Sequence, residues 1–227
     1  MTAAASWLGA LYRRAKGAHP RPDDVVRDFH RLYYDSASRT WSNTRWLGTP
    51  AQKCPLDLWV YQEILYELRP AVIVESGTAN GGSALFLASV CDLLGHGEVI
   101  SIDVLEQERP SHDRVTYLSG SSVAPEIRAR VTALVGDRRP VLVILDSDHS
   151  RDHVLEELRS YAPLVTPGSY AIVEDTNVNG HPVLSEFGAG PMEAVDQFLR
   201  ESTEFAIDAD REKFFLTFNP RGFLRKR

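Results

Sequence analysis

The chain has 227 residues, of which 43% are hydrophobic and 25% are charged, a balance that excludes a disordered or fibrous protein. Lys and Arg total 25 against 31 Asp and Glu, and no basic stripe is interleaved with aromatic residues, so nucleic acid is not an expected partner. This length suits one sizeable core. We expect one catalytic domain over residues 53–227, preceded by an N-terminal extension over residues 1–52.

Cysteine usage and the chain ends bear on the compartment. Cys54 and Cys91 are too few for a disulfide framework and are not spaced as a metal pair, which fits a reducing cytoplasm. The basic residues near the N-terminus follow a short apolar stretch, the reverse of a secretory signal, and no apolar run reaches membrane-spanning length. We expect a cytoplasmic protein without a membrane partner, a loosely attached lead-in over residues 1–22 and a solvated basic tail over residues 221–227.

Two helices are predicted before the main core. The segment from Pro20 to Asp24 is typical of a helix start, and apolar residues follow it at near-helical spacing. Pro55 and Asp57 begin a second helix, which stops at Pro70. An aromatic loop lies between them. Four aromatic residues of this region are candidates for a lid or a sugar-stacking wall: Trp41, Trp46, Trp59 and Tyr61. For Trp59, on its predicted helix, core packing is the alternative.

From residue 71 onward, short apolar runs alternate with helical stretches. Strands are expected over residues 71–74, 99–102, 115–118, 141–145 and 170–173, and helices over 83–94, 124–135, 150–161 and 192–200. Two further strands, 204–207 and 214–218, are expected to close the sheet as a hairpin. Continuous apolar strands are buried on both faces, so the pattern predicts an α/β fold with a mainly parallel sheet and helices on each side.

The residues that follow the first three strands indicate a nucleoside ligand, because ligands of open α/β sheets bind beyond the carboxyl ends of the strands. A glycine-rich turn over residues 75–83 lets backbone approach a ligand, with a purely structural turn as the alternative. Asp103 can accept both ribose hydroxyls of an adenosyl group. The Ser119–Ser122 segment offers polar contacts for adenine, or serves only as a loop and helix cap.

An acidic cluster follows the next two strands. Asp146, Asp148, Glu174 and Asp175 would converge at one edge of the sheet, and crowded carboxylates are relieved by a hard cation such as Mg²⁺. Asp148 has an alternative role as a cap of the helix over residues 150–161. His149 can act as a general base beside the metal or be structural at a helix start. His153, one helical turn later, is expected to be a packing or surface residue.

Three motifs resemble the cephalosporin hydroxylase family, which also contains rhamnosyl and macrolide-sugar O-methyltransferases. They are VESGTANGGS at 74–83, LDSDHS at 145–150 and VEDTNVNGHP at 173–182, and the similarity extends from about Trp46 to Phe218. The resemblance implies a Rossmann-like class I methyltransferase with a seven-stranded sheet and an N-terminal helical extension. It also implies S-adenosylmethionine as methyl donor and Mg²⁺ as metal.

The resemblance further implies a role for each matching residue. The metal ligands would be Asp146, Glu174 and Asp175, with His149 as the base. Asp148 is an alternative first ligand, but we favour Asp146 because it directly follows the strand and points into the ligand crevice. The residues expected to hold the methyl donor are Glu75, Gly77, Thr78, Ser83, Asp103, Ser122 and Asp146.

The function expected from these residues is O-methylation of a hydroxyl on a small natural product or its sugar. A metal-dependent oxygenase is the second hypothesis, disfavoured because no triad of two histidines and one carboxylate is evident. A non-catalytic adenosyl-binding module is the third, and the acidic cluster argues against it. The acceptor can be a sugar, a phenol or another hydroxylated metabolite. Related enzymes are oligomeric, so a homo-oligomer is expected.

Overall fold

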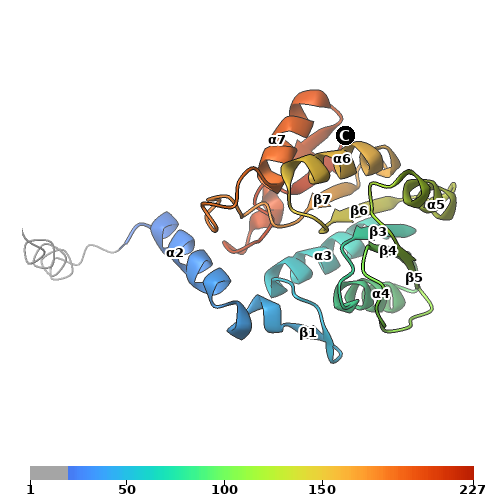
Figure 1. The fold of residues 1–227 in the computed structure, drawn as a ribbon, viewed down its shortest axis with the longest axis horizontal. Coiled ribbons are helices and arrows are strands. Elements are labelled where there is room, and N and C mark those ends of the chain that lie inside the picture. The colour runs from blue at the N-terminus through green and yellow to red at the C-terminus, as the bar shows by residue number, and fades with distance from the viewer. Residues whose placement is uncertain (1–19) are drawn as a thin grey trace, which may run out of the picture.

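The computed structural model describes residues 20–227, which fold around one seven-stranded sheet with helices on both faces (Figure 1). Most of the predicted lead-in over residues 1–22 lies outside this part of the chain. The strand order is β5-β4-β3-β6-β7-β9-β8. The strands are β3 (Val72–Ser76), β4 (Glu98–Asp103), β5 (Val115–Ser119), β6 (Val141–Leu145), β7 (Tyr170–Val173), β8 (Phe205–Ile207) and β9 (Phe223–Lys226).

The strands from β3 to β7 pair in parallel, whereas β9 is antiparallel to both of its neighbours. A small hairpin of β1 (Arg45–Trp46) and β2 (Thr49–Pro50) stands apart from this sheet. The helices are α2 (Pro22–Asp35), α3 (Pro55–Leu68), α4 (Gly82–Leu94), α5 (Pro125–Val135), α6 (Arg151–Tyr161) and α7 (Pro191–Glu201). Short 3₁₀ turns occupy Ala37–Arg39, Trp41–Asn43, Ala162–Leu164 and Ala209–Glu212.

The alternation of side chains along each strand divides the core into two layers. On β3, Val72 and Val74 pack with α5, α6 and α7, whereas Ile73 between them packs with α3 and α4. Both faces of the central strands are therefore buried, as the continuous apolar runs predict. The predicted class of fold is confirmed. None of the helices between residues 20 and 227 is long and apolar enough to cross a membrane.

The C-terminal part of the sheet differs from the sequence prediction. The strand expected over residues 204–207 is β8, but residues 214–218 form no strand. The last strand is β9, inside the segment that was expected to be a solvated basic tail. Phe223 and Leu224 are fully buried there, while Arg225 is exposed. The basic residues of this segment suggested a solvated tail. Its apolar residues Phe223 and Leu224 become buried only because β9 pairs with β7 and β8.

Residues 214–218 instead help to anchor the N-terminal part of the chain. Phe218 stacks on His30 of α2 with ring centroids 5.8 Å apart, and it also contacts the rings of Tyr34 and Trp41. The opposite face of α2 is exposed at Phe29 and Leu32. Helix α2 thus lies at the edge of the molecule, away from the sheet (Figure 1), while its inner face reaches toward the site described next.

Candidate active site

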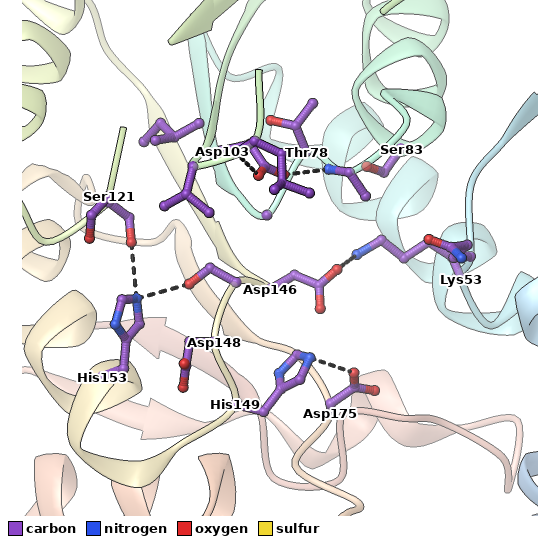
Figure 2. A pocket seen from close by; sticks show the side chains of 18 of the residues that line it. Lys53, Thr78, Ser83, Asp103, Ser121, Asp146, Asp148, His149, His153 and Asp175 are labelled. Carbon is purple, nitrogen blue, oxygen red and sulfur yellow. Dashed lines mark hydrogen bonds and ion pairs between the residues drawn. The ribbon is translucent and has the colours of Figure 1, made fainter. Parts of the chain in front are cut away.

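The carboxyl ends of the parallel strands open onto a cavity of about 660 Å³ (Figure 2). Its walls come from the glycine-rich loop after β3, the ends of β4, β5, β6 and β7, and the N-terminal aromatic segment. Polar and aromatic residues that line it include Tyr34, Trp41, Gln52, Lys53, Thr78, Ser83, Asp103, Ser121, Ser122, Asp146, Ser147, Asp148, His149, His153 and Asp175.

The glycine-rich loop is held against the end of β6. Gly77 has φ +85°, and a Cβ atom added there would lie 1.7 Å from the carbonyl oxygen of Asp146. Only glycine allows this approach. Thr78 is fixed next to it by a 2.6 Å hydrogen bond between its hydroxyl and that of Ser101. The loop predicted to bind the donor and the aspartate predicted to bind the metal are therefore direct neighbours.

Glu75 lies beneath this loop. Its side chain is 1% exposed and does not line the cavity, and its Oε2 accepts a hydrogen bond from Ser101 Oγ. Burial raises the pKa of the Glu75 carboxyl, opposed by the charge of Lys53. Glu75 Oε1 has no hydrogen-bond partner among the described residues. Glu75 was expected to hold the donor, but its side chain is buried and reaches Thr78 through the hydroxyl of Ser101.

Asp103 stands at the carboxyl end of β4, on the cavity wall. Its two carboxylate oxygens accept backbone hydrogen bonds from Ala79 at 2.7 Å and Leu105 at 2.8 Å. Arg109 approaches within 3.7 Å. Val104 and Leu105 follow as exposed apolar residues that line the same cavity. This end of the cavity therefore offers a fixed carboxylate beside an apolar surface.

Asp146, His149 and Asp175 bring three side chains with potential ligand atoms together at this edge of the sheet. Each offers one ligand atom, and these atoms all lie within 4.8 Å of one another. Asp175 directly follows Glu174 after β7 and has φ +53°, a turn that brings its carboxylate to 3.3 Å from His149 Nε2. The chain thus leaves strand alternation immediately after Val173, as two adjacent ligands would require. Burial raises the carboxyl pKa of both aspartates, and neighbouring carboxylates raise it further.

Glu174 is paired with a buried lysine beside this group. Lys53 Nζ lies 2.7 Å from Glu174 Oε1 and also donates to Asp146, and the Lys53 side chain is only 5% exposed. Burial alone would lower the lysine pKa, but the two carboxylates raise it overall. Burial and the Asp146 charge raise the pKa of Glu174 to about 7. Lys53 is not among the site residues predicted from the sequence, although a cluster of buried acids needs a cation to balance its charge.

Asp148 is separated from the acidic group. It is exposed, and its Oδ1 accepts a 2.7 Å hydrogen bond from the backbone of Ser150, one residue before α6 begins. Hydrogen bonds from Ser150 lower the pKa of the Asp148 carboxyl. This contact orders the turn that precedes α6, whose first turn has no side-chain cap. Asp148 is not among the three residues whose ligand atoms cluster.

His153 does not have the packing or surface position that was expected for it. It lines the cavity, and its Nε2 lies 3.1 Å from the hydroxyls of both Ser122 and Ser147. In Figure 2, His153 and Lys53 lie on opposite sides of Asp146. Helical spacing could not have placed the two histidines on one face, because His149 precedes α6 and only His153 lies in the helix.

One of the four candidate lid aromatics lines the cavity. Trp41 stacks on Tyr34 with ring centroids 5.4 Å apart, and both residues line the cavity. The other three lie elsewhere. Trp46 packs edge-on against Phe86, Trp59 is 58% exposed beside Glu63, and Tyr61 is buried against Asn219. Tyr34 was missed because a single tyrosine on a helix carries no signal of a cavity.

The strand order and the placement of the glycine-rich loop and the acidic group at the strand ends are those of the Rossmann-like α/β fold found in class I methyltransferases. The solved structure of CmcI with Mg and SAM has the same fold, with a TM-score of 0.63 and 23% identity over 82% of this chain and 77% of that chain. A putative caffeoyl-CoA O-methyltransferase from Staphylococcus aureus is a more distant fold neighbour, with a TM-score of 0.50 and 17% identity over 88% of this chain and 90% of that chain.

The sequence comparisons define the family. The rhamnosyl O-methyltransferase/CmcI family matches residues 38–227. A rhamnosyl O-methyltransferase of Mycobacterium leprae is 39% identical over 222 residues, which cover 94% of this chain and 96% of that protein. The rhamnosyl O-methyltransferase of Mycobacterium tuberculosis H37Rv is 38% identical, covering 90% and 86% respectively. The chain belongs to the rhamnosyl O-methyltransferase/CmcI family and is an O-methyltransferase.

Proposed function

We propose that this protein transfers a methyl group from S-adenosylmethionine to a sugar hydroxyl, in a reaction that requires Mg²⁺. The observation that carries the proposal is the contact between the donor loop and the acidic group, where Gly77 meets the backbone of Asp146. The names of the relatives support a rhamnosyl sugar as the acceptor, and the ligands of the CmcI structure support the donor and the metal.

The cavity fits the proposed donor. Its volume of about 660 Å³ is within the usual range for small-molecule sites. Asp103 would hold the ribose hydroxyls, and the apolar side chains of Val104 and Leu105 would lie against the face of adenine. The methionine part would lie along the glycine-rich loop at Gly77, Thr78 and Ser83, with Ser122 near the adenine edge and Asp146 near the sulfonium. Glu75, buried beneath the loop, would support Thr78 through the hydroxyl of Ser101.

The acidic group fits the proposed metal. Carboxylate oxygens are the ligands that Mg²⁺ prefers, and Asp146 and Asp175 supply them within 4.8 Å of each other. Glu174 would complete the set while keeping Lys53 as its partner. Bound there, Mg²⁺ would orient the acceptor hydroxyl and lower its pKa. The site contains one histidine and two aspartates, so it lacks the two-histidine facial triad of iron oxygenases.

His149 is the proposed general base. Its imidazole would take the proton of the acceptor hydroxyl, and the Asp175 carboxylate, 3.3 Å from Nε2, would stabilise the imidazolium that forms. The hydroxyl oxygen forms its bond to the methyl carbon as the bond from carbon to sulfur breaks. The sulfur keeps the electron pair of that bond, so the sulfonium becomes a neutral thioether. Asp146 and Asp175 would act on this oxygen through the metal that they hold.

The N-terminal extension would form the acceptor wall. Trp41 and Tyr34 stack at the cavity, and aromatic faces suit the apolar face of a sugar ring. Residues 1–52 would therefore act as an extension that completes the site of a catalytic domain over residues 53–227. We also propose a cytoplasmic location, which the two buried free cysteines support, and a homo-oligomeric state without a nucleic-acid or membrane partner.

Mass spectrometry of acceptors incubated with protein, Mg²⁺ and S-adenosylmethionine tests the proposal. The panel should include rhamnosyl glycosides, other sugars and phenols. We expect rhamnosyl compounds to gain one methyl group and the reaction to stop when EDTA removes the metal. Methylation that is unaffected by EDTA, or methylation of phenols alone, would contradict the proposal.

A further inference from the structure

A buried acid in α6 has no role in the chemistry described above. Glu157 is 0% exposed, and its Oε2 has no hydrogen-bond partner among the described residues. Its Oε1 accepts a 2.7 Å hydrogen bond from Ser147 Oγ and lies 3.6 Å from His153 Nε2. A buried carboxylate is costly unless nearby groups compensate it, so this arrangement calls for an explanation.

The directions of these hydrogen bonds follow from chemistry. Ser147 donates its only hydroxyl hydrogen to Glu157, so it must accept in its 3.1 Å contact with His153 Nε2. His153 Nε2 therefore carries a hydrogen and cannot accept one. The hydroxyl of Ser122, 3.1 Å from the same nitrogen, then keeps its own hydrogen free to donate elsewhere. The nearby carboxylate of Glu157 raises the pKa of His153, which favours the same donor state.

The position of Ser122 indicates what receives that hydrogen. Ser122 and His153 line the cavity, and Ser122 follows β5, the strand next to β4 and Asp103. Tyr161 donates to the Ser122 carbonyl at 2.5 Å, which fixes the backbone there. Because β5 lies next to β4, a nucleoside with its ribose at Asp103 would have the end of β5 within reach of its base. The edge of that base would face the Ser122 hydroxyl.

We propose that Glu157, Ser147 and His153 fix the Ser122 hydroxyl as a hydrogen-bond donor, so that the site selects adenine through an unprotonated ring nitrogen. The inference rests on the proposed donor and adds the residues that determine its specificity. Hypoxanthine carries a hydrogen on the ring nitrogen next to its oxygen. Two donors would then face each other, and this mismatch disfavours an inosyl ligand. His153 is a positioning residue in this arrangement.

Calorimetric titration with S-adenosylhomocysteine and S-inosylhomocysteine tests the inference. Wild-type protein should bind the adenosyl compound at least about tenfold more tightly than the inosyl compound. His153→Leu should weaken adenosyl binding about tenfold and reduce that preference, and Ser122→Ala should do the same. His153→Gln places an amide N–H where Nε2 stood, so it should retain most of the adenosyl affinity and most of the preference for the adenosyl compound. The exposed residue His96 supplies a matched control, His96→Leu, which should match wild type.

Thermal unfolding of each variant separates specificity from folding. If His153→Leu lowers the melting temperature but keeps the wild-type preference for the adenosyl compound, His153 is only structural and the inference is overturned. If both ligands bind wild type equally, the inference is also overturned while the proposed donor stands. Failure of wild type to bind S-adenosylhomocysteine at all would instead contradict the proposed function.

Discussion

The ammonium group of Lys53 lies 2.7 Å from the carboxylate of Glu174, and both side chains are buried. The same ammonium donates to Asp146, so one lysine balances Asp146, which lines the cavity, and Glu174, which is buried behind it and does not line it. Removing one partner of a buried ion pair leaves an uncompensated charge, which costs more than the pair itself contributes. Lys53 therefore offsets part of the negative charge of Asp146 and Glu174.

Lys53→Met should lower the free energy of unfolding by about 3–5 kcal/mol in metal-free buffer. Mg²⁺ should restore more stability to the variant than to wild type, because the acidic group has lost its built-in cation. Urea unfolding with and without Mg²⁺ measures both effects. The control is Lys213→Met, which breaks a partly exposed pair with Glu63 and should cost less than about 1 kcal/mol. Equal losses in the two variants would refute this role of Lys53.

Asp103→Ala should weaken the binding of S-adenosylhomocysteine by about 1.5–3 kcal/mol, the scale of hydrogen bonds to a charged group. Asp103→Asn should lose less, because it keeps one acceptor oxygen for the backbone N–H of Ala79 or Leu105. Calorimetry on both variants makes the comparison. The exposed residue Asp113 provides a control, Asp113→Ala. Unchanged affinity in Asp103→Ala would remove this carboxylate from the donor site.

His30 should make stability depend on pH. Burial lowers its pKa from 6.5 to about 4, so the folded protein excludes a proton that the unfolded chain binds. Between these pH values the unfolded state holds more protons, and stability falls as the pH falls. The full loss between pH 6.5 and 4 is about 3 kcal/mol. Urea unfolding at pH 7 and pH 5 should show a smaller difference for His30→Gln than for wild type and His96→Gln. The same difference in all three proteins would show that other groups determine the slope.

Much of the fold could be predicted from local patterns. The strands β3, β6 and β7 are short, largely apolar runs that are buried throughout, and α2 and α3 begin at Pro22 and Pro55, so each of these elements carries its own signal. β9 does not. Its buried Phe223 and Leu224 lie among basic residues that suggest a tail, and they become core only between β7 and β8. The structure of that segment is therefore determined by pairing with strands that are distant in the sequence.

The candidate site was predictable only where residues directly follow strands. Asp103, Asp146 and Asp175 stand at or just beyond strand ends, and the rule for open α/β sheets brings those ends together. Lys53 and Tyr34 reach the cavity from the N-terminal region, and no rule of strand order places them there. The relation of Glu157 to His153 depends on how α6 packs, which sequence spacing alone does not specify.

The metal ligand and the base can be separated by their dependence on Mg²⁺. Asp146→Asn removes a formal charge that faces the cation, so activity should require much more Mg²⁺ and recover in part at high concentration. His149→Ala should lower kcat by about 10²–10⁴ at saturating Mg²⁺, and extra metal should not restore it. Both variants keep the buried pair of Lys53 and Glu174.

The most direct test is the rate of methyl transfer to a rhamnosyl acceptor, measured against Mg²⁺ concentration for wild type, Asp146→Asn and His149→Ala. The account predicts a shift of the Mg²⁺ requirement in Asp146→Asn and a lower plateau with an unchanged Mg²⁺ requirement in His149→Ala. Wild-type turnover in His149→Ala, or an unchanged Mg²⁺ requirement in Asp146→Asn, would contradict it.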